Sequence, residues 1–152
     1  MKEFKSYTCI LIILMITALP ACGTDNIVGN NSGTDNTMRL QIGEKILTAT
    51  LVENSSTQAL KECLKAGPIT IDMRDYANIE KVGGLGTSLP RNDRHITAQP
   101  GELILYQGNA FVIYYKPNSW NFTRLGRIDD LTQEELIDIL GEGDVTVTLF
   151  LD

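Results

Sequence analysis

The chain has 152 residues, a formal net charge of −6 and three cysteines, and these values exclude several classes of protein. Its length fits one domain of ordinary size with short extensions. Residues 1–21 contribute a charge of +1, so the remaining chain carries −7. This acidic balance argues against a nucleic-acid partner, because such proteins neutralise phosphates with clustered Lys and Arg. The chain also lacks a polybasic segment for anionic lipids, so any attachment to a membrane should be hydrophobic.

Residues 1–21 have the pattern of a bacterial signal peptide. A short basic start is followed by an apolar run of 13 residues, Tyr7–Leu19. A bilayer-spanning helix needs about 20 residues, so this run fits the core of a signal peptide better than a membrane anchor. The run ends in Leu19-Pro20-Ala21-Cys22, which resembles the lipobox of bacterial lipoproteins. We therefore expect Cys22 to be lipidated and to hold the chain at a membrane of the cell envelope, outside the cytoplasm.

Ordinary secretion with cleavage after Ala21 is the alternative, although it would place the bulky Leu19 where such sites prefer a small residue. Gly23 follows Cys22, so no Asp argues for retention at an inner membrane, and the choice between inner and outer membrane stays open. Residues 22–37 are rich in Gly, Asn, Asp, Ser and Thr, which predicts a flexible tether. Residues 38–152 then form the folded domain.

Cysteine use predicts a domain without disulfides. Cys9 lies in the predicted signal and Cys22 would be acylated, so Cys63 would be the one remaining thiol. The domain must then be stabilised by its hydrophobic core alone.

The first half of the domain predicts a hairpin, a helix and a third strand. Met38–Ile42 and Lys45–Glu53 are apolar runs around a Gly43-Glu44 turn. A capping box of Ser55 and Gln58 is expected to open a helix that Gly67-Pro68 ends. This helix should bury Ala59, Leu60, Cys63 and Leu64.

Pro68–Asp75 predicts the third strand, with Ile69, Ile71 and Met73 on one side. The next segment, Tyr76–Gln99, is rich in Gly, Pro, Asn and Asp and predicts a long loop, in which Gly83, Gly84 and Gly86 would form turns.

The second half predicts a hairpin of Gly101–Tyr106 and Ala110–Lys116, a strand Asn121–Ile128, a helix and a closing strand Val145–Leu151. Thr132 and Glu135 form a capping box for this helix, which ends at Gly141. Its expected buried residues are Leu136, Ile137, Ile139 and Leu140. Seven or eight strands with two short helices predict a mainly β fold, a small closed antiparallel barrel capped at its ends by the helices, because closure removes exposed strand edges.

Several segments of the domain, taken together and in order, resemble the bacterial cyclophilin-like domain family. They are MRLQIGEKILTATLVENSSTQALKECL, PITIDMRDYANIEKVGGL, GELILYQGNAFVIYY, TRLGRID and VTVTLFL. The resemblance covers nearly all of residues 38–152 and implies a small cyclophilin-type β-barrel.

Cyclophilins isomerise X–Pro bonds with an arginine that belongs to a Phe-His-Arg signature on the strand after the first helix. Here that strand is Ile69–Asp75, which lacks the signature. Arg74 is an arginine in a similar place, but Asp72 and Asp75 flank it, so the catalytic role is not transferred to it. The resemblance therefore favours a non-enzymatic domain, with weak prolyl isomerase activity as the alternative.

One cluster of aromatic and basic residues suggests a binding site, and two interpretations of it stay open. The cluster contains Tyr114, Tyr115, Trp120, Phe122, Arg124 and Arg127. Tyr115 and Phe122 could pack inside the barrel while the arginines cover apolar surface or pair with Asp129. Alternatively, the cluster forms a groove for a ligand or peptide. In that case the candidate binding residues are Tyr115, Trp120, Phe122 and Arg124, together with Arg74.

No other chemistry is indicated. His95 is the single histidine and lies in a polar segment, so we expect a surface residue, and we expect neither a metal site nor a cofactor. The prediction is therefore a lipid-anchored module that binds a peptide or small molecule. A weak isomerase or foldase and a structural envelope protein are the alternatives.

Overall fold

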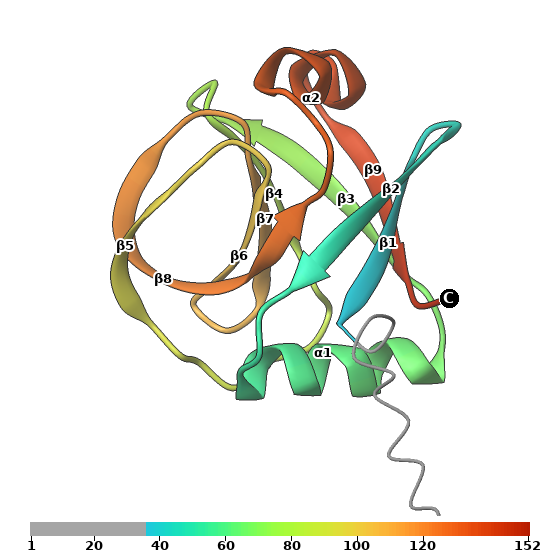
Figure 1. Cartoon of the computed structure of the whole chain (residues 1–152), viewed down its shortest axis with the longest axis vertical. Coiled ribbons are helices and arrows are strands. Elements are labelled where there is room, and N and C mark those ends of the chain that lie inside the picture. Colours follow the sequence, from blue (N-terminus) through green and yellow to red (C-terminus); the bar gives the residue numbers. More distant parts are fainter. Residues whose placement is uncertain (1–35) are drawn as a thin grey trace, which may run out of the picture.

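The computed structural model describes residues 36–152, which form nine strands and two helices (Figure 1). The predictions for the signal, Cys22 and most of the tether lie outside the described residues. Within residues 36–152, neither helix has the length and apolar character needed to cross a bilayer. The elements are β1 (Thr37–Ile42), β2 (Lys45–Leu51), α1 (Ser55–Ala66), β3 (Ile69–Tyr76), β4 (Glu80–Gly84), β5 (Arg94–Ala98), β6 (Glu102–Tyr106), β7 (Ala110–Tyr114), β8 (Asn118–Ile128), α2 (Gln133–Leu140) and β9 (Val145–Phe150).

Eight of these strands close into an antiparallel barrel, which confirms the predicted fold class. The strands follow one another in the order β2-β1-β9-β3-β4-β7-β6-β8, and β8 then pairs with β2. Every pairing is antiparallel. Closure gives the strands of the barrel wall partners on both sides.

The barrel interior is filled by alternate residues of the strands, and the helices lie at its two ends (Figure 1). On β3, Ile71 and Met73 point into the core, as their period-two spacing predicts. The expected face of α1 is also found, since Leu60 and Leu64 are buried. Cys63 is a free thiol that lies half-buried against the same core.

Barrel closure depends on a close approach of β8 to β2 at Gly126. Gly126 pairs with Leu51 on one side and with Leu103 on the other. A Cβ atom added to Gly126 would clash with the carbonyl oxygen of Thr50 and lie 2.9 Å from the Cα of Leu51. Only a residue without a side chain therefore permits this crossing.

Before it reaches the crossing, β8 forms a second small sheet with β5. Its residues 118–122 pair with β5, whereas its later residues pair with β6 and β2. Figure 1 shows β5 and the first half of β8 as an arch that curves away from β4, β6 and β7. Beneath it lies a second group of buried residues, called the outer cluster here, which consists of Ala98, Ile104, Val112, Tyr114 and Phe122.

The long loop predicted for Tyr76–Gln99 is wrong, because it contains β4 and β5. In β4, Lys81 points inward and is only 1% exposed. Because an inward position is charged, the segment lacks the alternation of apolar and polar residues by which a strand is recognised. Gly83 is a strand residue and not a turn residue, because its Cβ would clash with the Asp72 carbonyl oxygen of β3 at 2.6 Å. His95 is exposed as expected, but it lies in β5.

Two details of the predicted helices also need correction. The capping box of α1 consists of Asn54 and Thr57, one residue earlier than the predicted Ser55 and Gln58. In α2 the predicted box of Thr132 and Glu135 is confirmed. Ile137 was expected to be buried but is 38% exposed, because a helix that covers the end of a barrel buries a narrower stripe than the spacing suggests.

The Gly126→Ala substitution should destabilise the domain, because the added methyl group meets the backbone of β2. We expect the free energy of unfolding to fall by about 3 kcal/mol in chemical denaturation, at the upper end of the usual cost of overpacking. Gly84→Ala is the matched control, since nothing lies within 4 Å of the position that its Cβ atom would take. Equal effects of the two substitutions would contradict this account of closure.

Candidate functional site

A groove of about 450 Å³ lies on the outer face of the barrel, between β3, β4, β6, β7 and the first half of β8. We call it the aromatic groove. Its lining includes Arg74, Tyr76, Glu80, Val82, Tyr106, Tyr114, Asn118, Trp120 and Phe122. A volume of this size is typical of sites for small molecules or peptide side chains.

Exposed aromatic side chains gather at this groove. Trp120 is 59% exposed, Tyr76 57% and Tyr106 36%, and all three line it. Large aromatic side chains in water forgo the stabilisation that burial would give them. A concentration of them around one concave surface is therefore typical of a binding site.

The base of the groove is well packed, because Val112, Tyr114 and Phe122 belong to the outer cluster. Phe122 is 3% exposed and makes an edge contact with Tyr106, with ring centroids 6.5 Å apart. Its ring also lies 5.5 Å from that of Tyr114. The exposed aromatic side chains thus stand beside a packed layer of buried residues.

A carboxylate lies among these rings. Glu80 is 9% exposed and pairs across the sheet with Tyr76 on one side and Tyr114 on the other. Burial raises the pKa of the Glu80 carboxyl, and interaction with the Tyr114 hydroxyl offsets part of this rise. That hydroxyl also accepts a hydrogen bond of 3.2 Å from the Asn118 amide.

The structure brings three of the five predicted binding residues together. Arg74, Trp120 and Phe122 all line the aromatic groove. Arg74 lies on β3 opposite Val82 and points outward, because its neighbour Met73 points into the core. Phe122 belongs to the outer cluster and not to the barrel interior.

Tyr115 lies elsewhere, in a buried charged cluster between the strands and α2. Its hydroxyl donates a hydrogen bond of 2.7 Å to Asp75. The ammonium group of Lys81 lies 2.9 Å from the same carboxylate oxygen and also donates to the carbonyl oxygens of Gly141 and Gly143. The cluster therefore ties the end of α2 to β3 and β4.

Electrostatics within this cluster favour a charged Asp75. Desolvation raises the pKa of the Asp75 carboxyl, but hydrogen bonds from Lys81 and Tyr115 and the charge of Lys81 outweigh it, so the pKa is lowered overall. Burial and the neighbouring Asp75 raise the pKa of the Tyr115 hydroxyl.

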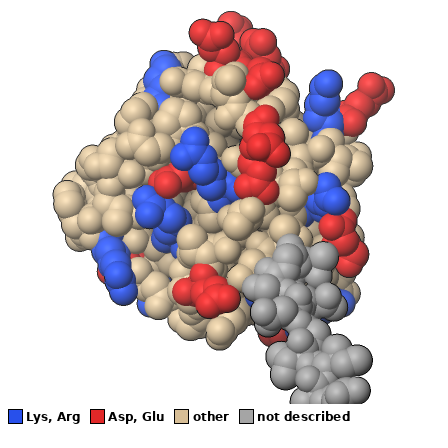
Figure 2. Space-filling model, in the orientation of Figure 1, with Lys and Arg blue, Asp and Glu red and all other residues tan. Residues whose placement is uncertain are grey.

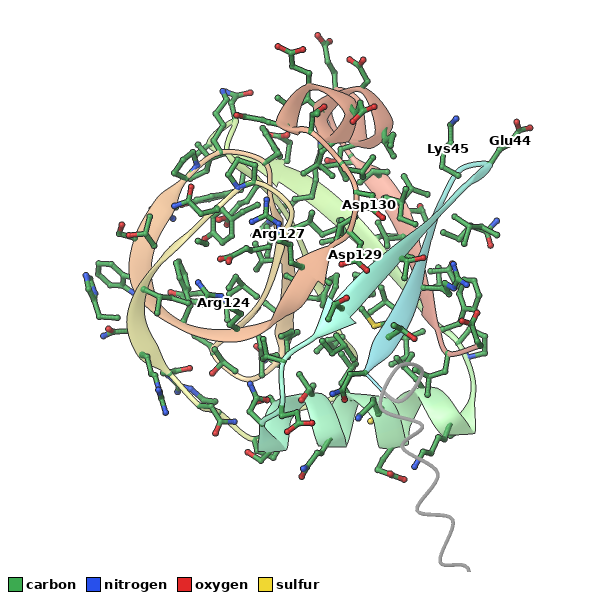
Figure 3. The ribbon with its side chains drawn as sticks, in the orientation of Figure 1. Glu44, Lys45, Arg124, Arg127, Asp129 and Asp130 are labelled. Carbon is green, nitrogen blue, oxygen red and sulfur yellow. The ribbon has the colours of Figure 1, made fainter. Side chains whose placement is uncertain are left out.

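Arg124 also lies outside the aromatic groove. Its guanidinium group forms an ion pair of 3.0 Å with Glu102, and its Nε atom is buried without a hydrogen-bond partner among the described residues. Arg124 pairs with Ile104 of β6, past the arch, and Figure 3 shows Arg127 further along β8, ahead of Asp129 and Asp130. The predicted pairing with Asp129 is not found, because that carboxylate accepts a hydrogen bond from Thr50.

Charged side chains are mixed on the face shown in Figure 2, where Lys and Arg lie beside Asp and Glu and acidic groups gather over α2. Within residues 36–152, no group of three His, Cys, Asp or Glu side chains is arranged to hold a metal ion.

Three important groove residues are absent from the sequence-based set: Tyr76, Glu80 and Tyr106. Tyr76 ends β3 and Glu80 begins β4, and both were predicted to lie in a loop. The sequence therefore did not indicate that they are paired across a sheet. Tyr106 ends β6, and its position beside Phe122 depends on the arch.

A second groove of about 550 Å³ adjoins the aromatic groove and shares Arg74, Val82 and Ala110 with it. It is also lined by Asp72 and Asp144. The two grooves are therefore neighbours on β3, β4 and β7.

Comparison with known proteins places nearly the whole described domain in one family. The model of a protein family described as the cyclophilin-like family matches residues 40–150. A search of curated proteins finds none that matches this chain.

Replacement of Lys81 by Met should lower the free energy of unfolding and should also make that free energy less dependent on pH. Breaking a buried ion pair costs roughly 3 kcal/mol at pH 7. Because the folded-state pKa of Asp75 lies below its ordinary value of 3.8, its stabilisation is present above that value and is lost as the pH falls through the lowered pKa. Lys81→Met removes the main cause of the lowering. Denaturation between pH 6 and pH 2 should therefore show a shallower acid dependence than in the wild type.

The exposed Lys45 at the tip of the β1–β2 hairpin (Figure 3) offers the control for this measurement, since Lys45→Met should change stability by less than about 0.5 kcal/mol. An unchanged acid dependence in Lys81→Met would show that Asp75 is not stabilised by this pair.

Proposed function

This chain belongs to the cyclophilin-like family, and we propose that it is a lipid-anchored, non-catalytic module of the cell envelope that binds an extended peptide in the aromatic groove. The observation that supports this proposal best is the gathering of Tyr76, Tyr106 and Trp120 around one concave surface. In a domain held only by its core, exposure of three such side chains is costly unless a ligand covers them.

The presence of two adjoining grooves favours an extended chain over a compact small molecule. The aromatic groove and its neighbour adjoin each other, so several consecutive residues could lie along them. Residues 118–122 of β8 pair with β5 only, which leaves one edge of this segment without a strand partner among residues 36–152. Unpaired strand edges and side-chain pockets together are a common way to hold peptides.

The anchor and the location depend on the sequence alone. The support is the apolar run that ends in Leu19-Pro20-Ala21-Cys22. Acyl chains on Cys22 would hold the module at a membrane, and residues 23–35 would separate the groove from the lipid head groups.

Prolyl isomerisation is the second candidate, and the position of Arg74 favours it. This guanidinium group lies at the junction of the two grooves and is free of ion pairs within the described residues. It could donate to the carbonyl group of a bound X–Pro bond. The proposal of a non-catalytic role is therefore tested on this residue.

Binding should require Trp120. We expect the indole N–H resonance of the wild type to shift when a panel of unstructured hexapeptides is added, and Trp120→Ala to lose most of the heat of binding in calorimetry. The substitution should leave stability nearly unchanged because the side chain is mostly exposed. Ile46→Ala is the matched control, since Ile46 is 58% exposed on β2 outside both grooves. Peptides that leave Trp120 unaffected would refute the binding function.

A prolyl isomerase assay on the wild type and two arginine variants separates binding from catalysis. For a non-catalytic module, a proline-containing peptide should isomerise at the uncatalysed rate with the wild type, Arg74→Ala and Arg124→Ala. A faster rate with the wild type that is lost in Arg74→Ala would instead establish the enzyme.

Substitution of Cys22 by Ser should release the protein from the membrane. In bacterial cells, the wild type should fractionate with membranes and show the mass of an acylated chain that begins at Cys22. The variant should lack the added acyl mass, because serine offers no thiol for the transfer. A wild-type chain of unmodified mass would exclude the anchor and leave the domain's binding function open.

A further inference from the structure

Glu80 differs from the other buried acidic residues of the domain in having no cationic partner. Among residues 36–152, the partly buried Asp75 pairs with Lys81 at 2.9 Å, and the buried Glu102 pairs with Arg124 at 3.0 Å. No Lys or Arg side chain of this part of the chain forms an ion pair with Glu80. The Tyr114 hydroxyl is a hydrogen-bond partner of Glu80, but a neutral hydroxyl supplies no counter-ion, and a buried carboxylate without one is unfavourable.

The surroundings of Glu80 have the chemistry of a cation site. Tyr76 and Tyr114 are its direct cross-strand neighbours, and side chains paired in this way lie about 5 Å apart at their Cβ atoms. Trp120 and Phe122 approach from β8 across the groove. Aromatic faces attract cations, and a carboxylate among them supplies the opposite charge.

We propose that the aromatic groove selects an organic cation, and in a bound peptide the ammonium group of a lysine side chain, which pairs with Glu80 between the rings. This inference rests on the proposed binding function and names the class of group that the groove holds. The lysine stem would contact the aromatic side chains while its charge reaches the carboxylate. The acidic balance of the chain outside residues 1–21, −7, would also favour the approach of a cation.

Arg74 is the residue that could oppose this selection, because it lines the same groove. It lies two residue pairs further along the β3–β4 ladder than Glu80, opposite Val82, and also lines the second groove. Asp72 and Asp144 line that second groove beside it. These carboxylates form no ion pair with Arg74 and offset only part of its charge, so Arg74→Gln should bind the lysine peptide more tightly than the wild type.

The experiment compares two peptides that differ only in charge. Trp120 is the single tryptophan of the chain, so intrinsic fluorescence reports directly on the groove. The full-length chain is titrated with acetyl-Ala-Lys-Ala-amide and with the same peptide carrying norleucine, which has the same carbon stem as lysine without the ammonium group. We expect the lysine peptide to bind at least tenfold more tightly. Butylammonium as a third probe shows whether the cation alone suffices or a peptide backbone is needed.

Glu80→Gln should abolish this preference. The substitution keeps the size of the side chain and removes a charge whose burial is unfavourable, so the variant should fold. We expect its affinity for the lysine peptide to fall at least tenfold and its affinity for the norleucine peptide to change less than twofold. Glu44→Gln is the matched control, because it removes the same charge from an exposed hairpin tip on the side of the molecule away from the arch (Figure 3). It should leave both affinities unchanged.

The outcomes separate this inference from the function on which it rests. Equal binding of the lysine and norleucine peptides, or a preference that survives in Glu80→Gln, would overturn cation selection and leave the peptide-binding function intact. If neither tripeptide binds while the panel of unstructured hexapeptides still shifts the indole resonance of Trp120, cation selection is likewise overturned and the peptide-binding function stays intact. If none of these ligands affects Trp120, both proposals fail.

Discussion

The close approach of β8 to β2 determines most of this structure. At Gly126 the strand has neighbours on both sides, and the space beside it is too small for a methyl group. Closure at this point completes the barrel and fixes the direction in which β8 arrives. The earlier half of the strand must therefore reach the crossing from the end of β7, and it does so as an arch over the outer face, paired with β5. The aromatic groove exists because this arch stands away from β4 and β7.

The groove combines features that a stable domain would otherwise avoid. Its rim exposes tryptophan and tyrosine to water, while Glu80 beneath them is buried without a counter-ion among the described residues. Elsewhere the same fold pairs its buried charges, as Lys81 shows with Asp75 and two carbonyl oxygens. The buried charge of Lys81 thus holds the end of α2, whereas no charged side chain of residues 36–152 forms an ion pair with Glu80.

The errors of the sequence-based interpretation have a common physical origin. Strands are recognised by alternation of apolar and polar residues, and β4 hides this alternation because its inward positions are a lysine and a glycine. Because β4 was not predicted, Tyr76 and Glu80 were assigned to a loop, and their proximity to Trp120 was not expected. Tyr115 and Arg124 were included because they are near Trp120 in the chain. Tyr115 follows Tyr114 directly and its hydroxyl bonds to Asp75 on the other side of the sheet. Arg124 alternates in phase with Trp120 and Phe122, but its guanidinium group pairs with Glu102 beyond the groove. The bulge of β8 between its contacts with Leu103 and Ile104 further alters this alternation.

The sequence by itself determined the two helices with most of their buried faces, most strands, the closed mainly β architecture and the family, because these follow from local periodicity, capping and the order of segments. The tertiary structure alone decided which side chains share the groove. Tyr76, Glu80, Tyr106 and Trp120 come from four different strands, and their proximity depends on strand order, register and the arch. No local pattern encodes these quantities, since they are set by long-range pairing and by the closure at Gly126.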